Sequence, residues 1–282
     1  QRLRELVLEL VREQAPTALI ELDEARFTLR EGLTVRGLNV SAPPRVLGAR
    51  PTRLVRVASA QFQLDWGATL QTALSLAPEP RFEAIRVVQP DVLLRFDARG
   101  RWRDEGLLRS PEASSNEEAD EETRGAWNLP PIELIAARIS LEHPQFFAGN
   151  VPQRVDDLTV ALRPTTAPGM LSLRGHGVSE AWGRLAMGGT IDVVARSVVL
   201  ETVNRRLRVD ERMIESLTPQ LRRAIEEFTA IPKEWAQRFG DGAGAQVEVE
   251  VEANVRLEPE RPVTLDLVVF VIGAQLAFEK FP

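Results

Sequence analysis

The sequence contains no cysteine among its 282 residues. Disulfides, thiolate metal ligands and a cysteine nucleophile are therefore excluded, while the compartment stays open because a periplasmic protein can also lack cysteine. Histidine is nearly as scarce, with only His143 and His176 present. We expect both at surface turns, because neither has a serine or aspartate at a catalytic spacing and two histidines cannot complete a four-ligand zinc site.

An excess of charge of one sign is missing from most of the chain. The net charge is −6, but residues 112 to 124 hold an acidic run that includes one arginine, and the remainder is nearly neutral. The arginines elsewhere are scattered along segments that also carry glutamate and aspartate. Nucleic-acid binding normally needs a basic face, so we exclude a nucleic-acid partner.

Long apolar runs are absent too, since no stretch reaches the roughly 18 residues that suggest a membrane-spanning helix. The sequence begins at Gln1 and stops after Pro282. We therefore expect a piece of a longer chain, from which a signal or membrane anchor has been removed.

Motifs for catalysis, cofactors and metals are also lacking. The glycines of 240–244 follow a helical tract and precede a strand, which is the reverse of a dinucleotide-binding loop. Glu248, Glu250 and Glu252 share one strand face, where a solvated surface is favoured over a calcium site. We predict no enzymatic activity, no cofactor and no metal.

Two segments have helical spacing of their apolar residues. Residues 1–14 predict an amphipathic helix ended by Pro16, either packed on the sheet or continuing from an absent membrane anchor. Residues 210–238 predict a helical tract capped by Asp210, with kinks at Pro219 and Pro232. A shorter stretch, 69–76, also has spacing closer to helical.

The rest of the chain alternates apolar and polar residues with a period of two, which predicts strands. These strands fall within 17–66, 82–97, 132–209 and 247–259, and a last pair is expected at 263–272 and 274–278. The phase slips at Gly32 and Gly37, which predicts a turn and a bulge. Asp97 to Gly100 is expected to form a turn after the 82–97 strand.

We therefore divide the chain into an amphipathic helix at 1–15, a first β unit at 16–109 and an acidic flexible insertion at 110–128. A second β unit follows at 129–209, then the helical tract at 210–240 and a third, truncated β unit at 241–282. The fold class is mainly β, with long strands that suit one broad curved sheet.

One face of these strands is apolar and must be covered. A dozen apolar side chains left in water would cost on the order of 20–35 kcal/mol, more than the total stability of about 5–15 kcal/mol. A second sheet, the two helical segments or a bound apolar ligand could provide the cover. Two helical segments are too few to cover so many strands, so a sandwich or barrel core and a lipid-filled groove both remain open.

The N-terminal half resembles the AsmA-like proteins, which belong with TamB and the chorein-type proteins to the bridge-like lipid transfer, or repeating β-groove, superfamily. The resemblance covers residues 17–142 and rests on spaced Pro, Asp, Gly and apolar positions around an acidic insertion. Those positions are Ile85, Val87, Pro90, Val92, Leu94, Phe96, Asp97, Gly100, Trp102, Leu129, Pro130, Pro131, Ile132, Ile139 and Leu141. The segments Phe27–Leu29, Gly37–Val40 and Val57–Trp66 fit the same pattern.

The resemblance implies a taco-like β-groove of long antiparallel strands that carries phospholipid acyl chains between membranes while head groups stay in solvent. It further implies a periplasmic location, an inner-membrane anchor outside this sequence and a partner at the outer membrane. The predicted lipid-binding residues are Phe27, Leu29, Phe62, Leu64, Val92, Leu94, Phe96, Ile139, Leu141, Leu171, Leu173, Val249, Val251 and Val255. The alternatives are a closed β-sandwich used for adhesion or scaffolding and a role in outer-membrane protein assembly.

Overall fold

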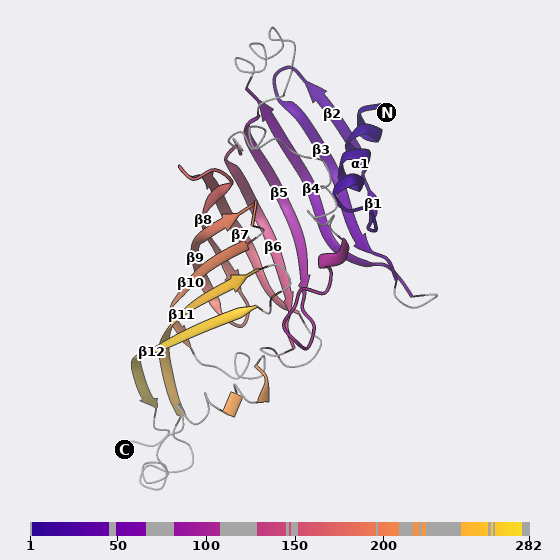
Figure 1. Ribbon diagram of the computed structural model, residues 1–282. Helices are drawn as coiled ribbons and strands as arrows, with labels where there is room; N and C mark the ends of the chain where they lie inside the picture. The colour runs from indigo at the N-terminus through magenta and orange to yellow at the C-terminus, as the bar shows by residue number, and fades with distance from the viewer. Residues whose placement is uncertain are drawn as a thin grey trace.

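The computed structural model describes residues 2–44, 49–65, 82–107, 129–144, 147, 152–195, 197–208, 217–219, 222–223, 244–258, 261 and 263–277. Its strands form one 12-stranded sheet in the order β1-β3-β4-β5-β6-β7-β8-β9-β10-β11-β12, with β2 also paired to β3. The sheet is curved and open, not closed into a barrel (Figure 1). The predicted mainly β fold with a curved sheet is therefore confirmed, and the described strands do not form a two-sheet sandwich.

The elements follow the period-two and helical segments of the sequence. The helices are α1 (Arg2–Gln14) and the short 3-10 helix η1 (Glu105–Leu107). The first strands are β1 (Leu19–Glu21), β2 (Glu24–Thr28), β3 (Gly32–Ala42), β4 (Thr52–Leu64) and β5 (Phe82–Arg95). The later ones are β6 (Ile132–Glu142), β7 (Gln153–Pro164), β8 (Met170–Ser179), β9 (Gly183–Asp192), β10 (Ser197–Arg208), β11 (Gly244–Leu257) and β12 (Thr264–Ala277).

Two features of the sheet differ from the prediction. Strands β5 and β6 pair in parallel, with Ile85 opposite Ile132, because the connection between them is long enough to return to the same end of the sheet. The prediction of two strands, at 263–272 and 274–278, is wrong, because β12 is one continuous strand. Gly273 lies beside a register shift between β11 and β12, so the glycine marks an irregularity within the strand.

Several predicted segments fall outside the described residues. These are the helical stretch at 69–76, the acidic insertion at 110–128 and most of the tract at 210–240. Within that tract, Pro219, Arg222 and Arg223 are helical, and the amide of Arg222 donates to the carbonyl of Thr218 at 2.8 Å. The two β units at 16–109 and 129–209 are joined by the β5–β6 ladder into the same sheet.

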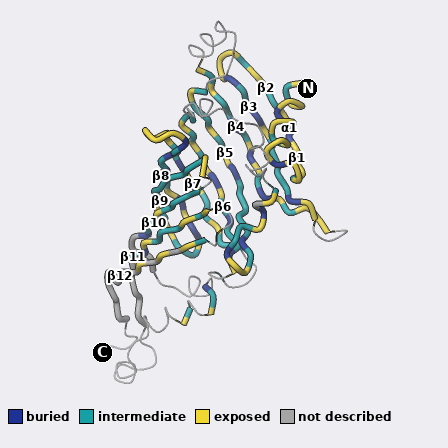
Figure 2. Tube along the Cα trace, in the orientation of Figure 1, coloured by how far each residue is buried: buried dark blue, intermediate teal, exposed yellow. Residues whose placement is uncertain are grey.

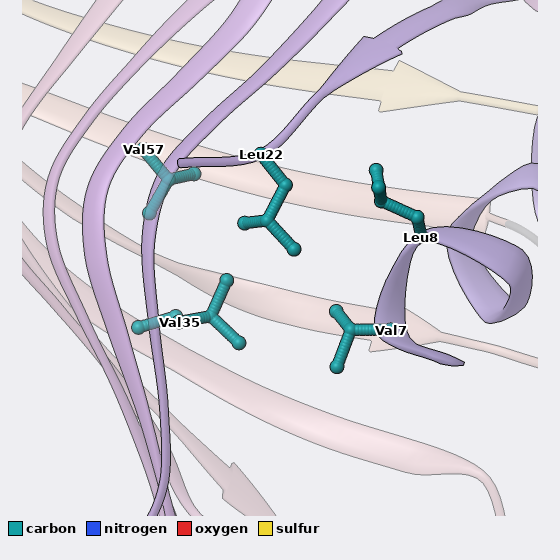
Figure 3. Close-up of a cluster of buried hydrophobic side chains, with 6 residues drawn as sticks. Val7, Leu8, Leu22, Val35 and Val57 are labelled. Atoms are coloured by element: carbon teal, nitrogen blue, oxygen red, sulfur yellow. The ribbon is translucent and has the colours of Figure 1, made fainter. Parts of the chain in front are cut away.

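Helix α1 packs on the β1–β4 end of the sheet through one apolar stripe. Val7 and Leu8 are buried against Leu22, Val35 and Val57, and Figure 3 shows these side chains converging from the helix and the strands. The Nε of Arg4 adds a hydrogen bond of 2.7 Å to the carbonyl of Leu22. The favoured prediction, a helix packed on the sheet, is thus observed. On the outward side of the same helix, Leu6 and Leu10 are more than half exposed.

A line of backbone irregularities crosses the middle of the sheet. Gly37 in β3, Gln89 in β5, Ala136 in β6 and Asp157 in β7 all have positive φ, between 49° and 64°. The register places Gly37, Gln89 and Ala136 in one transverse row, with Ala58 of β4 between the first two. Asp157 lies beside a register shift between β7 and β8. We call this row the crease.

The crease explains why the alternation of apolar and polar residues shifts by one position within each of the strands β3 to β7. Each strand has apolar-face residues spaced by two, three and two positions, as in Leu33, Val35, Leu38 and Val40 of β3. The extra residue in the middle is the one at or next to the crease. The register between β3, β4, β5 and β6 continues unbroken across the crease, so these residues are left-handed kinks within paired strands. The bulge predicted at Gly37 is therefore wrong, because the neighbouring strands shift together and no residue is left without a position opposite it. The crease also accommodates Pro90 within a central strand, where proline is otherwise excluded.

Candidate functional site

One face of the sheet is apolar along its whole length. Directly paired residues share a face, so the register can be followed from strand to strand. The longest such row starts in β2 and ends in β12. Its members are Phe27, Leu33, Phe62, Ile85, Ile132, Leu162, Leu173, Gly189, Leu200, Val255 and Leu265. None of them is charged. We call the face that carries this row the apolar face.

The neighbouring row, one residue further along each strand, faces the other way and is polar. It contains Arg26, Thr34, Gln61, Arg86, Glu133, Ala161, Arg174, Gly188, Glu201, Asn254 and Asp266. Ion pairs cross this face, from Arg86 to Glu133 at 3.2 Å and from Arg138 to Asp156 at 2.6 Å. Because these side chains are about half exposed, the ion pairs mark a solvated surface and contribute little to stability.

Two hydrophobic clusters lie on the apolar face. Side chains of α1 pack on the first, and the second contains no residue of α1. The first contains Val35, Val57 and Ala60 and lies under α1. The second contains Ala137, Leu158, Val160 and Leu173, with Leu158 fully buried. Among the described elements, α1 contacts β1 and β2, and the strands make most of their contacts with their neighbours in the sheet. Figure 2 shows buried and half-buried residues interspersed with exposed ones along the strands, and many exposed residues at turns and on α1.

Most predicted lipid-binding residues lie on the apolar face. Those placed there by the register are Phe27, Phe62, Val92, Leu94, Ile139, Leu141, Leu171, Leu173, Val249, Val251 and Val255. Leu64 pairs with Phe82 at the end of β4, beyond a register shift. Leu29 does not join the others, because it lies in the turn after β2 and is 74% exposed. Phe96 is buried at the end of the face.

The sequence reasoning missed the residues nearest the crease. Leu134, Ala137, Leu158 and Val160 belong to the second cluster but were not proposed. The slip in the spacing of their apolar residues was the signal that could have found them, because a left-handed residue within a strand lets residues three positions apart share one face.

A compact turn closes the apolar face at the end of β5. The Oδ1 of Asp97 accepts hydrogen bonds from the amides of Arg99 and Arg101, at 2.8 and 2.9 Å. The amide of Gly100, with φ of 74°, donates to the carbonyl of Asp97 at 2.9 Å. The predicted turn at 97–100 is therefore confirmed. The backbone amides on Asp97 lower the pKa of its carboxyl group, chiefly through the Arg101 amide.

Buried polar contacts hold this turn against the sheet. Arg95 donates to both carboxylate oxygens of Asp104, at 2.9 and 2.5 Å, and this pair is largely buried. The hydrogen bonds that Arg95 donates to Asp104 raise the pKa of the Arg95 guanidinium. Phe96 forms an isolated antiparallel bridge with Trp102. We name residues 95–104 the β5 turn.

His143 packs directly against the β5 turn. Its ring centroid lies 5.0 Å from that of Phe96, and the residue is 3% exposed. The expected surface-turn position for His143 is therefore wrong, because the parallel pairing of β6 with β5 carries it into the interior. Burial lowers the pKa of its imidazole. His176 is exposed as expected, but it lies within strand β8 and not at a turn.

A hollow of about 480 Å³, lined by both apolar and polar residues, lies at the opposite end of strands β4–β7. Gln61, Arg86, Glu133 and Arg163 are among its lining residues, and Ala84 and Ala161 leave room between them. Arg86 is already paired with Glu133, so Arg163 is the one charged lining residue outside that pair. The hollow is therefore a second candidate for a ligand site, in addition to the apolar face.

Two further observations concern only the part of the chain that the structure describes. There, no helix combines the length and hydropathy required to traverse a bilayer. Within the same residues, His, Asp and Glu side chains do not gather in groups of three or more that could hold a metal ion.

Comparison of the chain with protein-family models, with curated proteins and with solved structures gave no match. The AsmA-like assignment therefore stays a prediction that rests on the sequence resemblance.

Proposed function

We propose that this protein binds phospholipid acyl chains on its apolar face and carries them along the curved sheet as an open groove. The observation that supports this most is the uncharged row from Phe27 to Leu265, which runs across ten inter-strand steps. At about 4.8 Å per step, the row is roughly 48 Å long. It is thus longer than the hydrocarbon core of a bilayer, which is about 30 Å thick.

The energetics of lipid transfer favour such a surface. Each methylene group withdrawn from a membrane into water costs about 0.8 kcal/mol, so a 16-carbon chain costs on the order of 12 kcal/mol. A continuous apolar row removes most of this cost, whereas one charged side chain in the row would interrupt it. Head groups would remain at the open side in contact with water. The proposed setting is the periplasm, with an anchor in the inner membrane, as the sequence resemblance implies.

The test uses two adjacent leucines that point in opposite directions. Leu94 lies on the apolar face opposite Leu141, whereas Leu93 lies on the other face opposite Ser140, and both are half-buried. We expect lipid extraction and mass spectrometry to find phospholipid in the purified wild type and in Leu93→Asp, and several-fold less in Leu94→Asp. Circular dichroism checks that both variants are folded.

Two outcomes contradict the proposal. One is wild-type protein that carries no phospholipid after mild purification and takes up none from vesicles. The other is equal loss of lipid in both folded variants, because a carboxylate on the polar face should leave the apolar row intact.

A further inference from the structure

The hollow across β4–β7 lies on the face opposite the apolar face, which we call the polar face. Most of its lining residues come from two polar rows of the sheet. One is the row that contains the Arg86–Glu133 ion pair. The other, one position beyond Ile85 and Ile132, runs through Gln63, Ala84, Pro131 and Arg163. The short side chains of Ala84 and Pro131 leave a trough between Gln63 at one end and Arg163 at the other.

A second arginine lies beside Arg163. In the β7–β8 ladder, Ala161 is opposite Arg174 and Arg163 is opposite Ser172, so the two arginines are diagonal neighbours on the polar face. Diagonal positions of an antiparallel pair lie about 7–8 Å apart, a distance that two long side chains can bridge. Both arginines are exposed, and the side chains of Ala161 and Ser172 next to them are short. The two guanidinium groups can therefore converge on one small ligand.

These arginines are not neutralised by carboxylates. The ion pairs found within the described residues include neither Arg163 nor Arg174. By register, the nearest described carboxylate to Arg163 is Glu133, which is already paired with Arg86. For Arg174 it is Glu201, two strands away beyond Gly188. Since like charges on adjacent strands repel each other, a bound anion would stabilise this pair.

We propose that Arg163 and Arg174 bind a phosphate monoester at the β7 end of the hollow. A phosphate monoester carries a charge of about −1.5 to −2 at neutral pH, which matches two cations. The planar guanidinium group also offers parallel donors that fit phosphate oxygens. The carbon atoms of the ester would lie in the trough, over Ala84 and Pro131. Because the site is on the polar face, it does not depend on the proposed lipid-carrier function.

Two probes present the same phosphate chemistry from different sources. Calorimetric titration with glycerol 3-phosphate measures binding of a free ester. Co-sedimentation with phosphatidylcholine vesicles that contain phosphatidic acid measures binding of a lipid head group, and pure phosphatidylcholine vesicles give the background. We expect the wild type to bind at least one probe. Arg163→Gln and Arg174→Gln should each weaken that binding by about 10- to 100-fold, the range expected for the loss of a charge-assisted hydrogen bond.

Arg184→Gln is the matched control. Arg184 is exposed on the polar face, opposite Val178, but it lies near the start of β9 and away from the hollow. The substitution removes the same charge from the same face, so this variant should bind like the wild type. All three arginines are exposed, and circular dichroism checks that each variant is folded.

The outcomes are distinct. Binding of glycerol 3-phosphate supports a site for a soluble ester, and binding only to vesicles with phosphatidic acid supports a site for a lipid head group. A wild type that binds neither probe overturns the proposal. Equal weakening by all three substitutions also overturns it, because it would indicate general attraction of anions to the face. These results leave the lipid-carrier function to its own test with Leu93 and Leu94.

Discussion

The crease predicts that glycine should stabilise a strand at Ala136, although glycine normally weakens strands. Ala136 has φ of 51° and is exposed on β6. A non-glycine residue in the left-handed region costs about 1–2 kcal/mol, because its Cβ approaches the following carbonyl oxygen. Glycine removes that cost but loses about 0.5–1 kcal/mol of additional chain entropy on folding. The net expectation for Ala136→Gly is a gain in the free energy of unfolding of about 0.5–1 kcal/mol.

The sheet provides a matched control in the same transverse row. Ala58 on β4 is also exposed, and the register places it opposite Gln89, but it is not among the residues with positive φ. Only the entropy term acts there, so Ala58→Gly should lower the free energy of unfolding by about 0.5–1 kcal/mol. The two Ala→Gly changes should therefore differ by about 1–2 kcal/mol and have opposite signs.

Urea denaturation followed by circular dichroism measures this difference through the midpoint and slope of each transition. Gln89→Gly and Asp157→Gly extend the test to the neighbouring strands, where φ is 49° in both cases. We expect gains of the same size. Equal destabilisation by Ala136→Gly and Ala58→Gly would refute the reasoning, since it would mean that the left-handed backbone carries no strain.

Two further predictions concern the β5 turn and α1. Because burial lowers the pKa of His143, the unfolded chain binds the proton more readily, so the free energy of unfolding should fall as the pH drops below about 6.5. Urea titrations at pH 7.5 and 5.5 measure this loss, which His143→Phe should reduce; an unchanged pH dependence would contradict it. In α1, Leu8→Ala should cost about 2–5 kcal/mol because Leu8 is buried, and exposed Leu10→Ala less than about 0.5 kcal/mol. Similar losses in thermal stability for both would show that α1 does not pack as described.

The β strands, the N-terminal helix and the apolar character of one face follow from the sequence itself. Val92, Leu94, Ile139 and Leu141 alternate with polar neighbours, and a period of two directs alternate side chains to opposite faces. The slip in alternation at Gly37 could also be read from the sequence, because glycine readily adopts the left-handed backbone found there, although the predicted bulge is absent from the β3–β4 register.

The tertiary structure alone decided which strands became neighbours and how far the sheet turned. The parallel pairing of β5 with β6, which buries His143 against Phe96, depends on a long connection whose path no local pattern encodes. The crease exists only because left-handed residues in separate strands come into one transverse row. The amide of Val263 donates to the carbonyl of Gly100 although seven inter-strand steps separate β12 from β5. This contact results from twist summed over those steps, so no single segment of the sequence contains it.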